Sequence, residues 1–316
     1  MIDCVITQPI HEEGLALLNA AGLTVHVAAD PGLMTLAPHL ADARAVITRN
    51  AGFSAAMLTA APRLEVIGSH GAGVDAIDLS AAEARGIIVV NTPGANAQSV
   101  AELAFALVFA CAKMIVPADR AVRADDFSFR YRQTSFELQG RTLGLVGFGA
   151  IGRRMAGMAK AFGMRVAVCS QHASAEDLAE CGAESLSLDA LCAQADIVSL
   201  HGLPRDAARF DAARFTRMKP GAVFINTARG ALVEEAALAQ ALVDGRLAAA
   251  GIDVFATEPL DRQNPLLAAP NLVMTPHVGG STEEALARTA REVAGDIVRV
   301  LRGESPRNPV TSGPAK

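Results

Sequence analysis

The sequence predicts an α/β fold with two parallel-sheet domains and a cleft between them. Short apolar runs alternate with longer helix-like segments along almost the whole chain, which is typical of βαβ units. The runs are apolar nearly throughout, as expected for strands of a parallel sheet that is covered on both faces. The chain has 316 residues, which is enough for two domains of ordinary size.

The first series of predicted strands occupies the N-terminal third of the chain. A long helix is then predicted over about 98–115, and Pro117 is expected to end or bend it. The segment 119–140 is rich in Arg and Asp and has weak periodicity, which indicates an exposed arm. The predicted strands of this series are 4–6, 25–27, 45–47, 64–67 and 87–90, with a helix over 12–20.

A second series of predicted strands follows the arm, and its helices again separate short apolar runs. An amphipathic helix over 283–301 ends the pattern, and the tail over 305–309 is predicted to be a loop. The two series indicate two separate sheets. The predicted strands of the second series are 143–146, 165–168, 197–200, 222–225, 249–252 and 272–274.

Composition excludes several classes of protein. Lys and Arg number 28 and Asp and Glu 33, for a net charge of −5, so no nucleic-acid or membrane partner is expected. The longest apolar run, 103–112, is shorter than the roughly 20 residues of a bilayer span, and the N-terminus does not resemble a secretory signal. Five cysteines without a CxxC pattern indicate a reduced, cytoplasmic chain with no metal site.

A glycine-rich loop points to a dinucleotide cofactor. The residues Gly147, Phe148, Gly149, Ala150, Ile151 and Gly152 fit G-x-G-x-x-G, follow a predicted strand and open a predicted helix. This context predicts a Rossmann-like or flavodoxin-like domain. The first glycine would allow a tight turn, the second an approach of the backbone to a pyrophosphate, and the third close packing of helix and strand. The start of the helix would offer N–H groups to the phosphates.

The next strand end bears on the choice between NAD and NADP. A carboxylate usually stands there to bind the ribose hydroxyls, but this chain has Ser170, Gln171 and His172, and no acidic residue lies between Glu137 and Glu176. The sequence therefore favours NADP, with Ser170 and His172 as partners of a 2′-phosphate and Arg153 near it. The alternative is that Ser170 and Gln171 bind the hydroxyls of NAD.

Three further stretches at predicted strand ends carry the residues of a hydride-transfer site. Arg229 is suited to hold a substrate carboxylate, and His277 to donate a proton to the forming alkoxide. Glu258 is the expected partner of His277, and Asp253 is expected to meet the nicotinamide. His201 is a rival catalytic histidine, or else a structural or cofactor-binding one. We assign His201, Thr227, Ala228 and Gly279 to the cofactor site.

These motifs, in this order, resemble the D-isomer-specific 2-hydroxyacid dehydrogenase family, which includes phosphoglycerate dehydrogenases and glyoxylate/hydroxypyruvate reductases. The likeness also covers the runs 71–75, 91–94 and 100–102. It implies the same roles for Arg229, Glu258 and His277. It further implies that the backbone N–H groups of Ala72, Gly73 and Val74 bind the substrate carboxylate.

The resemblance also implies a domain division and an assembly. A dinucleotide-binding domain at 98–284 would be inserted into a substrate domain made of 1–97 and 285–316. A homodimer would form largely through the cofactor domain, to which the arm at 119–140 belongs.

Departures from the family pattern bear on the substrate. The phosphoglycerate branch usually carries Arg where this chain has Ser69, and an altered loop after His201 brings in Arg205, which could touch an anion. We therefore predict hydride transfer between NAD(P)H and C2 of a small 2-oxo or 2-hydroxy acid, with D preference, such as glyoxylate or hydroxypyruvate. The alternatives are a D-3-phosphoglycerate dehydrogenase, an enzyme for another donor such as formate or phosphite, and a non-catalytic, NAD(H)-sensing protein like the family's corepressors.

Overall fold

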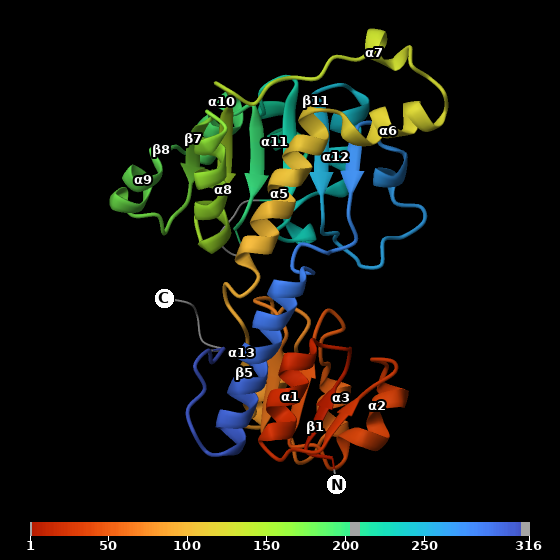
Figure 1. Cartoon of the computed structure of the whole chain (residues 1–316), viewed down its shortest axis with the longest axis vertical. Coiled ribbons are helices and arrows are strands. Elements are labelled where there is room, and N and C mark those ends of the chain that lie inside the picture. The colour runs from red at the N-terminus through yellow and green to blue at the C-terminus, as the bar shows by residue number, and fades with distance from the viewer. Residues whose placement is uncertain (1, 203–208, 311–316) are drawn as a thin grey trace. The chain divides into compact units, whose positions relative to one another are not determined.

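The computed structural model describes residues 2–202 and 209–310, which divide into two units. Unit 1 consists of Met1–Asn96 and Gly280–Lys316, and unit 2 of Ala97–Gly279. Each unit is built on a parallel sheet with helices on its faces (Figure 1). The predicted α/β class with two parallel sheets is therefore confirmed.

Unit 1 contains a five-stranded sheet in the order β2-β1-β3-β4-β5. Helices α1 (Glu12–Ala20) and α13 (Glu283–Leu301) pack together on one face, and three shorter helices cover the other. The C-terminal helix thus completes the core of the N-terminal strands. The strands are β1 (Cys4–Ile6), β2 (Val25–Val27), β3 (Ala45–Thr48), β4 (Val66–Ser69) and β5 (Ile88–Val90), and the shorter helices are α2 (Leu33–Leu40), α3 (Ala55–Ala60) and α4 (Leu79–Ala84).

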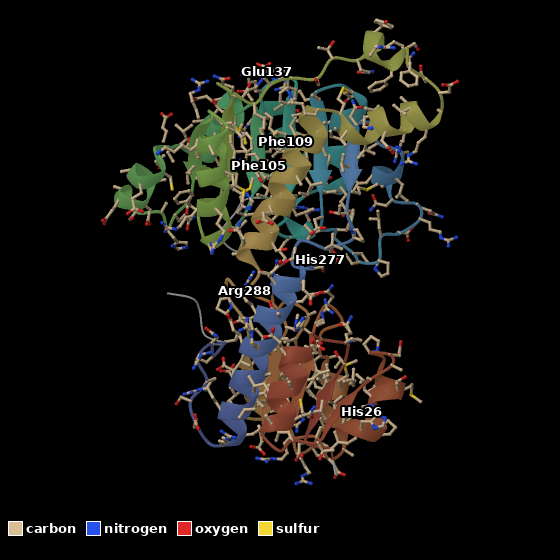
Figure 2. The ribbon with its side chains drawn as sticks, viewed as in Figure 1. His26, Phe105, Phe109, Glu137, His277 and Arg288 are labelled. Atoms are coloured by element: carbon tan, nitrogen blue, oxygen red, sulfur yellow. The ribbon has the colours of Figure 1, made fainter. Side chains whose placement is uncertain are left out.

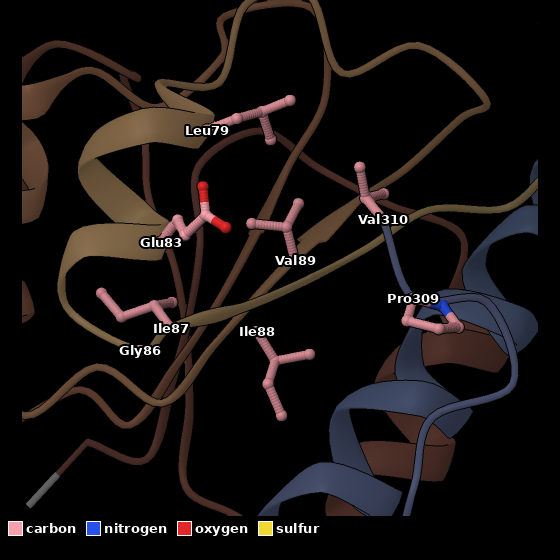
Figure 3. Close-up of a pocket in the computed structure, with 8 residues that line it drawn as sticks. All are labelled: Leu79, Glu83, Gly86, Ile87, Ile88, Val89, Pro309 and Val310. Atoms are coloured by element: carbon pink, nitrogen blue, oxygen red, sulfur yellow. The ribbon is translucent and has the colours of Figure 1, made fainter. Parts of the chain in front are cut away.

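The segment after α13 runs along the outer edge of β5. The backbone N–H of Val310 donates to Val89 O at 2.8 Å, and that of Asn91 donates to Asn308 O at 3.2 Å. A pocket of about 250 Å³ lies between this segment, β5 and α4, and Figure 3 shows the side chains that line it, including Glu83 and Ile88. The predicted tail loop therefore covers part of an edge strand.

Unit 2 contains a seven-stranded sheet in the order β12-β11-β10-β9-β6-β7-β8. The strands β6, β9 and β10 are buried throughout because helices cover both faces. The edge strand β8, half-buried to exposed, was not predicted from the sequence because it has no apolar run. The strands are β6 (Thr142–Val146), β7 (Arg165–Cys169), β8 (Ala183–Ser185), β9 (Ile197–Leu200), β10 (Ala222–Asn226), β11 (Leu247–Ile252) and β12 (Leu272–Met274).

Two apolar clusters hold the layers of unit 2 together. Helices α5 (Ala97–Ala112) and α8 (Ala150–Ala161) pack on one face of the sheet, and their contact includes the stacked rings of Phe105 and Phe162. The other face is covered by α10 (Leu188–Gln194), α11 (Ala212–Arg217) and α12 (Glu235–Val243). Helix α9 (Ala175–Cys181) contacts the edge strand β8.

The long predicted helix is in fact two helices. Helix α5 ends at Ala112, and α6 (Ile115–Arg123) begins after Met114, which has a left-handed φ of 54°. Pro117 does not end the first helix; it lies in the first turn of α6, where the missing N–H costs nothing. A short helix α7 (Phe129–Arg132) follows within the predicted arm.

No single described helix is long and apolar enough to cross a bilayer; α5 with α6, bent by 58°, is one pair that together reaches the required length and composition.

Candidate functional site

The glycine loop between β6 and α8 has the geometry that each of its glycines predicts. Gly147 has a φ of 99°, and a Cβ there would lie 2.6 Å from the backbone nitrogen of Gly202. A Cβ at Gly152 would lie 2.6 Å from the carbonyl oxygen of Gly147, so helix and turn pack without room for a side chain. A Cβ at Gly149 would meet nothing within 4 Å. One glycine therefore makes the turn, one allows close packing, and one leaves the backbone open to a ligand.

The start of α8 and two nearby strand ends leave polar groups for a dinucleotide. Gly149 caps the helix without a side chain, so the first N–H groups of α8 are open to an anion. Nδ1 of His201, after β9, and Oγ1 of Thr227, after β10, are buried and have no partner within the described residues. Buried polar groups normally have partners. The residues present therefore fit the implied cofactor.

His201 is a neutral residue in this setting. Its Nε2 lies 2.9 Å from Ser199 Oγ, and burial lowers the pKa of the imidazole to about 4. Its backbone N–H donates to Val146 O at 2.7 Å, which fixes it at the end of the central strands beside the glycine loop. A neutral, buried ring is a poor proton donor near neutral pH, so the position favours a structural or cofactor-binding role over the rival catalytic one.

The strand end that bears on NADP is shaped by a turn and by an ion pair. Ser170 Oγ accepts a hydrogen bond from the backbone N–H of His172 at 3.2 Å, and Gln171 and His172 are exposed. Arg153, expected to lie near a 2′-phosphate, binds Asp177 in the first turn of α9, with Nη2 2.7 Å from Oδ2. Sequence reasoning missed Asp177, although the spacing of Ser174 and Asp177 is that of a capping box.

Arg229 follows β10 in a turn that its neighbours hold in place. Asn226 ends the strand, and its side chain donates to Arg229 O at 2.9 Å and accepts from the N–H of Ala228 at 3.0 Å. The guanidinium is half-buried, and its Nη1 donates to Ala228 O at 2.8 Å. A Cβ at Gly230 would lie 1.9 Å from the carbonyl carbon of Phe255. The turns after β10 and β11 therefore touch through a glycine.

Glu258 and His277 are brought together from the turns after β11 and β12. Glu258 Oε2 lies 2.7 Å from His277 Nδ1, and the Glu258 Oε1 atom accepts from the backbone N–H of Phe255 at 3.0 Å. Both side chains are about one-third exposed, at 32% and 39%. Figure 2 labels His277 in the turn after β12. Since Nδ1 faces the carboxylate, the other ring nitrogen is left for a ligand.

Asp253 is buried at the end of β11 and holds the turn that carries His277. Its Oδ1 accepts from Thr275 Oγ1 at 2.6 Å and from the N–H of Val278 at 2.9 Å. Its Oδ2 accepts from the N–H of Gly279 at 2.8 Å. The structure thus gives the carboxylate a set of protein partners that the sequence did not suggest. The expected contact with the nicotinamide stays a prediction.

The three residues predicted to bind a carboxylate form a loop after β4 in unit 1. The carbonyl oxygen of Ala72 accepts from Asn91 Nδ2 at 2.8 Å, and that of Gly73 accepts from Ser69 Oγ at 2.6 Å. Within the part of the chain that the structure describes, the N–H groups of Ala72, Gly73 and Val74 have no protein acceptor. Successive free N–H groups of this kind form an anion-binding concavity.

The last two predictions concern Arg205 and metal binding. Arg205 lies outside the described residues. Across residues 2–202 and 209–310, no three His, Cys, Asp or Glu side chains gather as a set of metal ligands.

A family model and curated proteins match large parts of this chain. Residues 105–279 match the family model described as D-isomer specific 2-hydroxyacid dehydrogenase, NAD binding domain. The D-3-phosphoglycerate dehydrogenase of Archaeoglobus fulgidus is 37% identical over 309 residues, which are 96% of this chain and 58% of that protein. The glyoxylate reductase of Korarchaeum cryptofilum is 38% identical over 260 residues, which are 80% of this chain and 78% of that protein.

Solved structures share the whole fold. The crystal structure of the TT0316 protein from Thermus thermophilus matches with a TM-score of 0.88 at 35% identity, covering 98% of this chain and all of that one. The chain spans only about half to three-fifths of the length of several phosphoglycerate dehydrogenases that it matches. The family match covers more than half of the chain and includes the glycine loop, Arg229, Glu258 and His277. The chain belongs to the D-isomer-specific 2-hydroxyacid dehydrogenase family.

Proposed function

We propose that the chain is an oxidoreductase that transfers a hydride between NAD(P)H and C2 of a small 2-oxo or 2-hydroxy acid, with preference for the D isomer. The observation that carries the proposal is the 2.7 Å contact of Glu258 with His277, in the same unit as the open glycine loop. A carboxylate that orients an imidazole beside a nicotinamide site is the arrangement that carbonyl reduction needs.

Arg229, Glu258 and His277 would each have a separate role in the reaction, set by the chemistry of the side chain. Arg229 would hold the carboxylate of the acid in a fixed orientation, because a guanidinium matches a carboxylate with two parallel hydrogen bonds. Glu258 would fix the ring of His277 through Nδ1, so that Nε2 donates the proton to the forming alkoxide. The nicotinamide supplies or accepts the hydride when it is bound. The N–H groups of residues 72–74 would bind the acid's carboxylate as well.

We further propose that the acid carries no phosphate, with glyoxylate and hydroxypyruvate as the best candidates. Ser69 stands where the phosphoglycerate branch usually has Arg, and its hydroxyl is engaged with Gly73 O at 2.6 Å. The side chain is buried, with 4% exposed, and it has no charge to offer a phosphate. Ser69 therefore shapes the loop instead of binding an anion.

A second candidate substrate is a phosphorylated acid. The phosphoglycerate dehydrogenase of Archaeoglobus fulgidus aligns with 96% of this chain, which favours D-3-phosphoglycerate as the alternative. Hydroxypyruvate and phosphohydroxypyruvate, the 2-oxo acids of the two candidates, differ by one phosphate, so a direct comparison of these two acids separates the candidates.

Unit 1 would be the substrate domain and unit 2 the dinucleotide-binding domain. The chain would act in the cytoplasm as a homodimer formed through unit 2. Helix α6 and the rest of the arm support a subunit contact, because they carry large apolar side chains that are more than half exposed. These are Ile115, Val122, Phe127 and Tyr131.

The preference for NADP that the sequence favours stays a prediction, and the ion pair of Arg153 with Asp177 argues against it.

The test is cofactor oxidation with purified protein. NADH and NADPH would each be mixed with glyoxylate, hydroxypyruvate, pyruvate and phosphohydroxypyruvate, and the loss of absorbance followed. We expect turnover with a small unphosphorylated acid and at least tenfold lower kcat/KM with the phosphorylated one, about the discrimination of one well-placed interaction. Cofactor binding without turnover on any 2-oxo acid would favour the NAD(H)-sensing alternative, and preference for the phosphorylated acid would favour the second candidate.

A further inference from the structure

An ion pair connects the helix of the glycine loop with the helix that follows β7. Arg153 of α8 donates from Nη2 to Asp177 Oδ2 at 2.7 Å, and Nη1 bonds Oδ1 as well. Asp177 also accepts from the backbone N–H of Ser174 at 3.2 Å, while Ser174 Oγ accepts from the N–H of Asp177. The carboxylate is thus held by a bidentate guanidinium and by a capping box.

The pair lies beside the part of the site that would meet the adenosine ribose. The guanidinium carbon of Arg153 is 5.2 Å from the ring centre of Phe148, which is the second residue of the glycine loop. Asp177 follows the segment 170–174, which leaves the end of β7, where dinucleotide-binding domains hold the ribose hydroxyls. The pair therefore joins the helix that follows the glycine loop to the first turn of the helix that follows β7, the strand whose end has no carboxylate of its own.

Both members of the pair are charged at neutral pH. The hydrogen bonds from Arg153 and Ser174 hold the pKa of Asp177 well below its usual range. The Arg153 side chain remains 41% exposed and that of Asp177 27%, so a ligand has access to both.

We propose that Asp177, by binding Arg153, makes the cofactor site prefer NAD(H) over NADP(H). The inference rests on the proposed function. A 2′-phosphate carries up to two negative charges and would gain a strong partner in a free guanidinium. To reach Arg153 it must displace Asp177 or lie close to its carboxylate, and like charges repel. NAD(H) has only hydroxyls at this point, which Ser170 and Gln171 can bind without displacing anything. Asp177 of α9 thus disfavours a 2′-phosphate, as a carboxylate at the strand end usually does.

Calorimetric titration tests this directly, and it suits a chain without Trp. The ligands are NADH, NADPH and two fragments without nicotinamide, 5′-AMP and adenosine 2′,5′-bisphosphate. For the wild type we expect tighter binding of NADH than of NADPH. Asp177→Asn keeps the shape and removes the charge. It should tighten NADPH binding about tenfold, a change typical of removing one nearby like charge, and leave NADH binding nearly unchanged. Adenosine 2′,5′-bisphosphate should bind this variant more tightly than the wild type, and 5′-AMP should bind both equally.

Three further variants isolate the pair. Glu180→Gln removes an equal charge from the same helix, where Glu180 acts on Arg153 only through space, so it should shift the preference far less. Ser174→Ala weakens the capping box but keeps the charge of Asp177, and it should leave the preference as it is. The double variant Arg153→Gln, Asp177→Asn should lose the gain in NADPH binding. Thermal unfolding of each variant would show that α9 is still folded.

The outcomes separate the two proposals. Equal shifts in Asp177→Asn and Glu180→Gln, or a wild type that binds NADPH as tightly as NADH, would overturn the role of Asp177 while the proposed function stands. Absence of binding by either complete cofactor would overturn the proposed function itself.

Discussion

The backbone N–H of His277 donates to the carbonyl oxygen of Asp253 at 2.9 Å, and the side chain of the same aspartate accepts from Thr275, two residues before that histidine, and from Val278, directly after it. His277 has a φ of 54°, in the left-handed region that is uncommon for residues other than glycine. Such a conformation persists where the surroundings over-determine it. The hydrogen bonds to Asp253 supply that constraint, so this buried carboxylate sets the direction of the imidazole.

The first prediction concerns Asp253 as a positioning residue for His277. Asp253→Asn should lower kcat on the order of 10- to 100-fold, because an amide nitrogen replaces one acceptor of backbone N–H groups and loosens the turn. The pH dependence of kcat should change as well as the value of kcat, since the ring of His277 moves relative to Glu258. A mere loss of stability would lower the amount of folded enzyme and leave the pH profile of the remainder as in the wild type. Steady-state kinetics across pH would distinguish these cases.

A second prediction separates the imidazole from its partner. His277→Ala should lower turnover about 10²- to 10⁴-fold, the usual contribution of a general acid, while the affinity for the cofactor persists. Glu258→Gln should give a smaller loss, because the ring remains but its orienting carboxylate is gone. Stopped-flow measurement of hydride transfer would check both. Wild-type rates in His277→Ala would remove His277 from the mechanism.

A third prediction concerns the rival histidine. Burial keeps the pKa of His201 at about 4, so its imidazole is neutral from about pH 5 upward. His201→Asn should therefore leave the pH at which kcat/KM is half-maximal where it is, and change mainly the KM for the cofactor. A shift of the pH profile in this variant would show that His201 exchanges the proton.

A fourth prediction compares two glycines of one loop. Gly149→Ala should fold as the wild type does, because its φ is −79° and a Cβ there would meet nothing within 4 Å, yet its affinity for the dinucleotide should fall about tenfold or more. Gly147→Ala should lose about 1–3 kcal/mol of stability or more, because of its φ of 99° and the 2.6 Å approach to Gly202. Thermal unfolding and calorimetric titration of both variants would measure the two effects. Equal loss of stability in both would contradict the idea that Gly149 is reserved for a ligand.

A fifth prediction concerns acid stability. Asp196 is buried and accepts from the N–H of Thr142 at 2.8 Å and from Lys219 Nζ at 2.7 Å. Burial raises its pKa, but the hydrogen bonds from Lys219 and Thr142 and the charges of Lys219 and Arg141 outweigh it, so the pKa is lowered overall. A lowered pKa contributes stability above the unfolded-state value of about 3.9, and this contribution is lost as the pH falls through the folded-state value.

Asp196→Asn should therefore lower the unfolding free energy at pH 7 by about 1–3 kcal/mol. The difference from the wild type should shrink when the comparison is repeated near pH 3. Denaturant unfolding of both proteins at the two pH values is the measurement. A difference that stays constant between them would show that the charge of Asp196 plays no part.

Much of the fold can be predicted from short patterns in the sequence. The apolar runs of β6, β9 and β10 identify buried parallel strands, because a strand covered on both faces has no polar side to alternate with. The glycine loop is also predictable from the sequence, because its tight turn requires glycine. Gly147 has a φ of 99°, a conformation that local sterics disfavour for a residue with a side chain. Strand ends in a parallel sheet share an edge, which is why the order of strands predicts that Arg229, Glu258 and His277 stand at one edge of the sheet.

Only the tertiary structure decided the partners across longer separations. It joined Arg153 to Asp177, 24 residues apart, and it directed the carboxylate of Asp253 to the N–H of Gly279, 26 residues on. It also placed the break after α5 at Met114, before the proline that the sequence marked. By itself the sequence determined most of the elements and the chemical groups that stand at their ends, because burial and backbone sterics act over a few residues. Which of those groups meet depends on how helices and turns pack on the sheet, and that packing is the sum of many contacts that no short pattern contains.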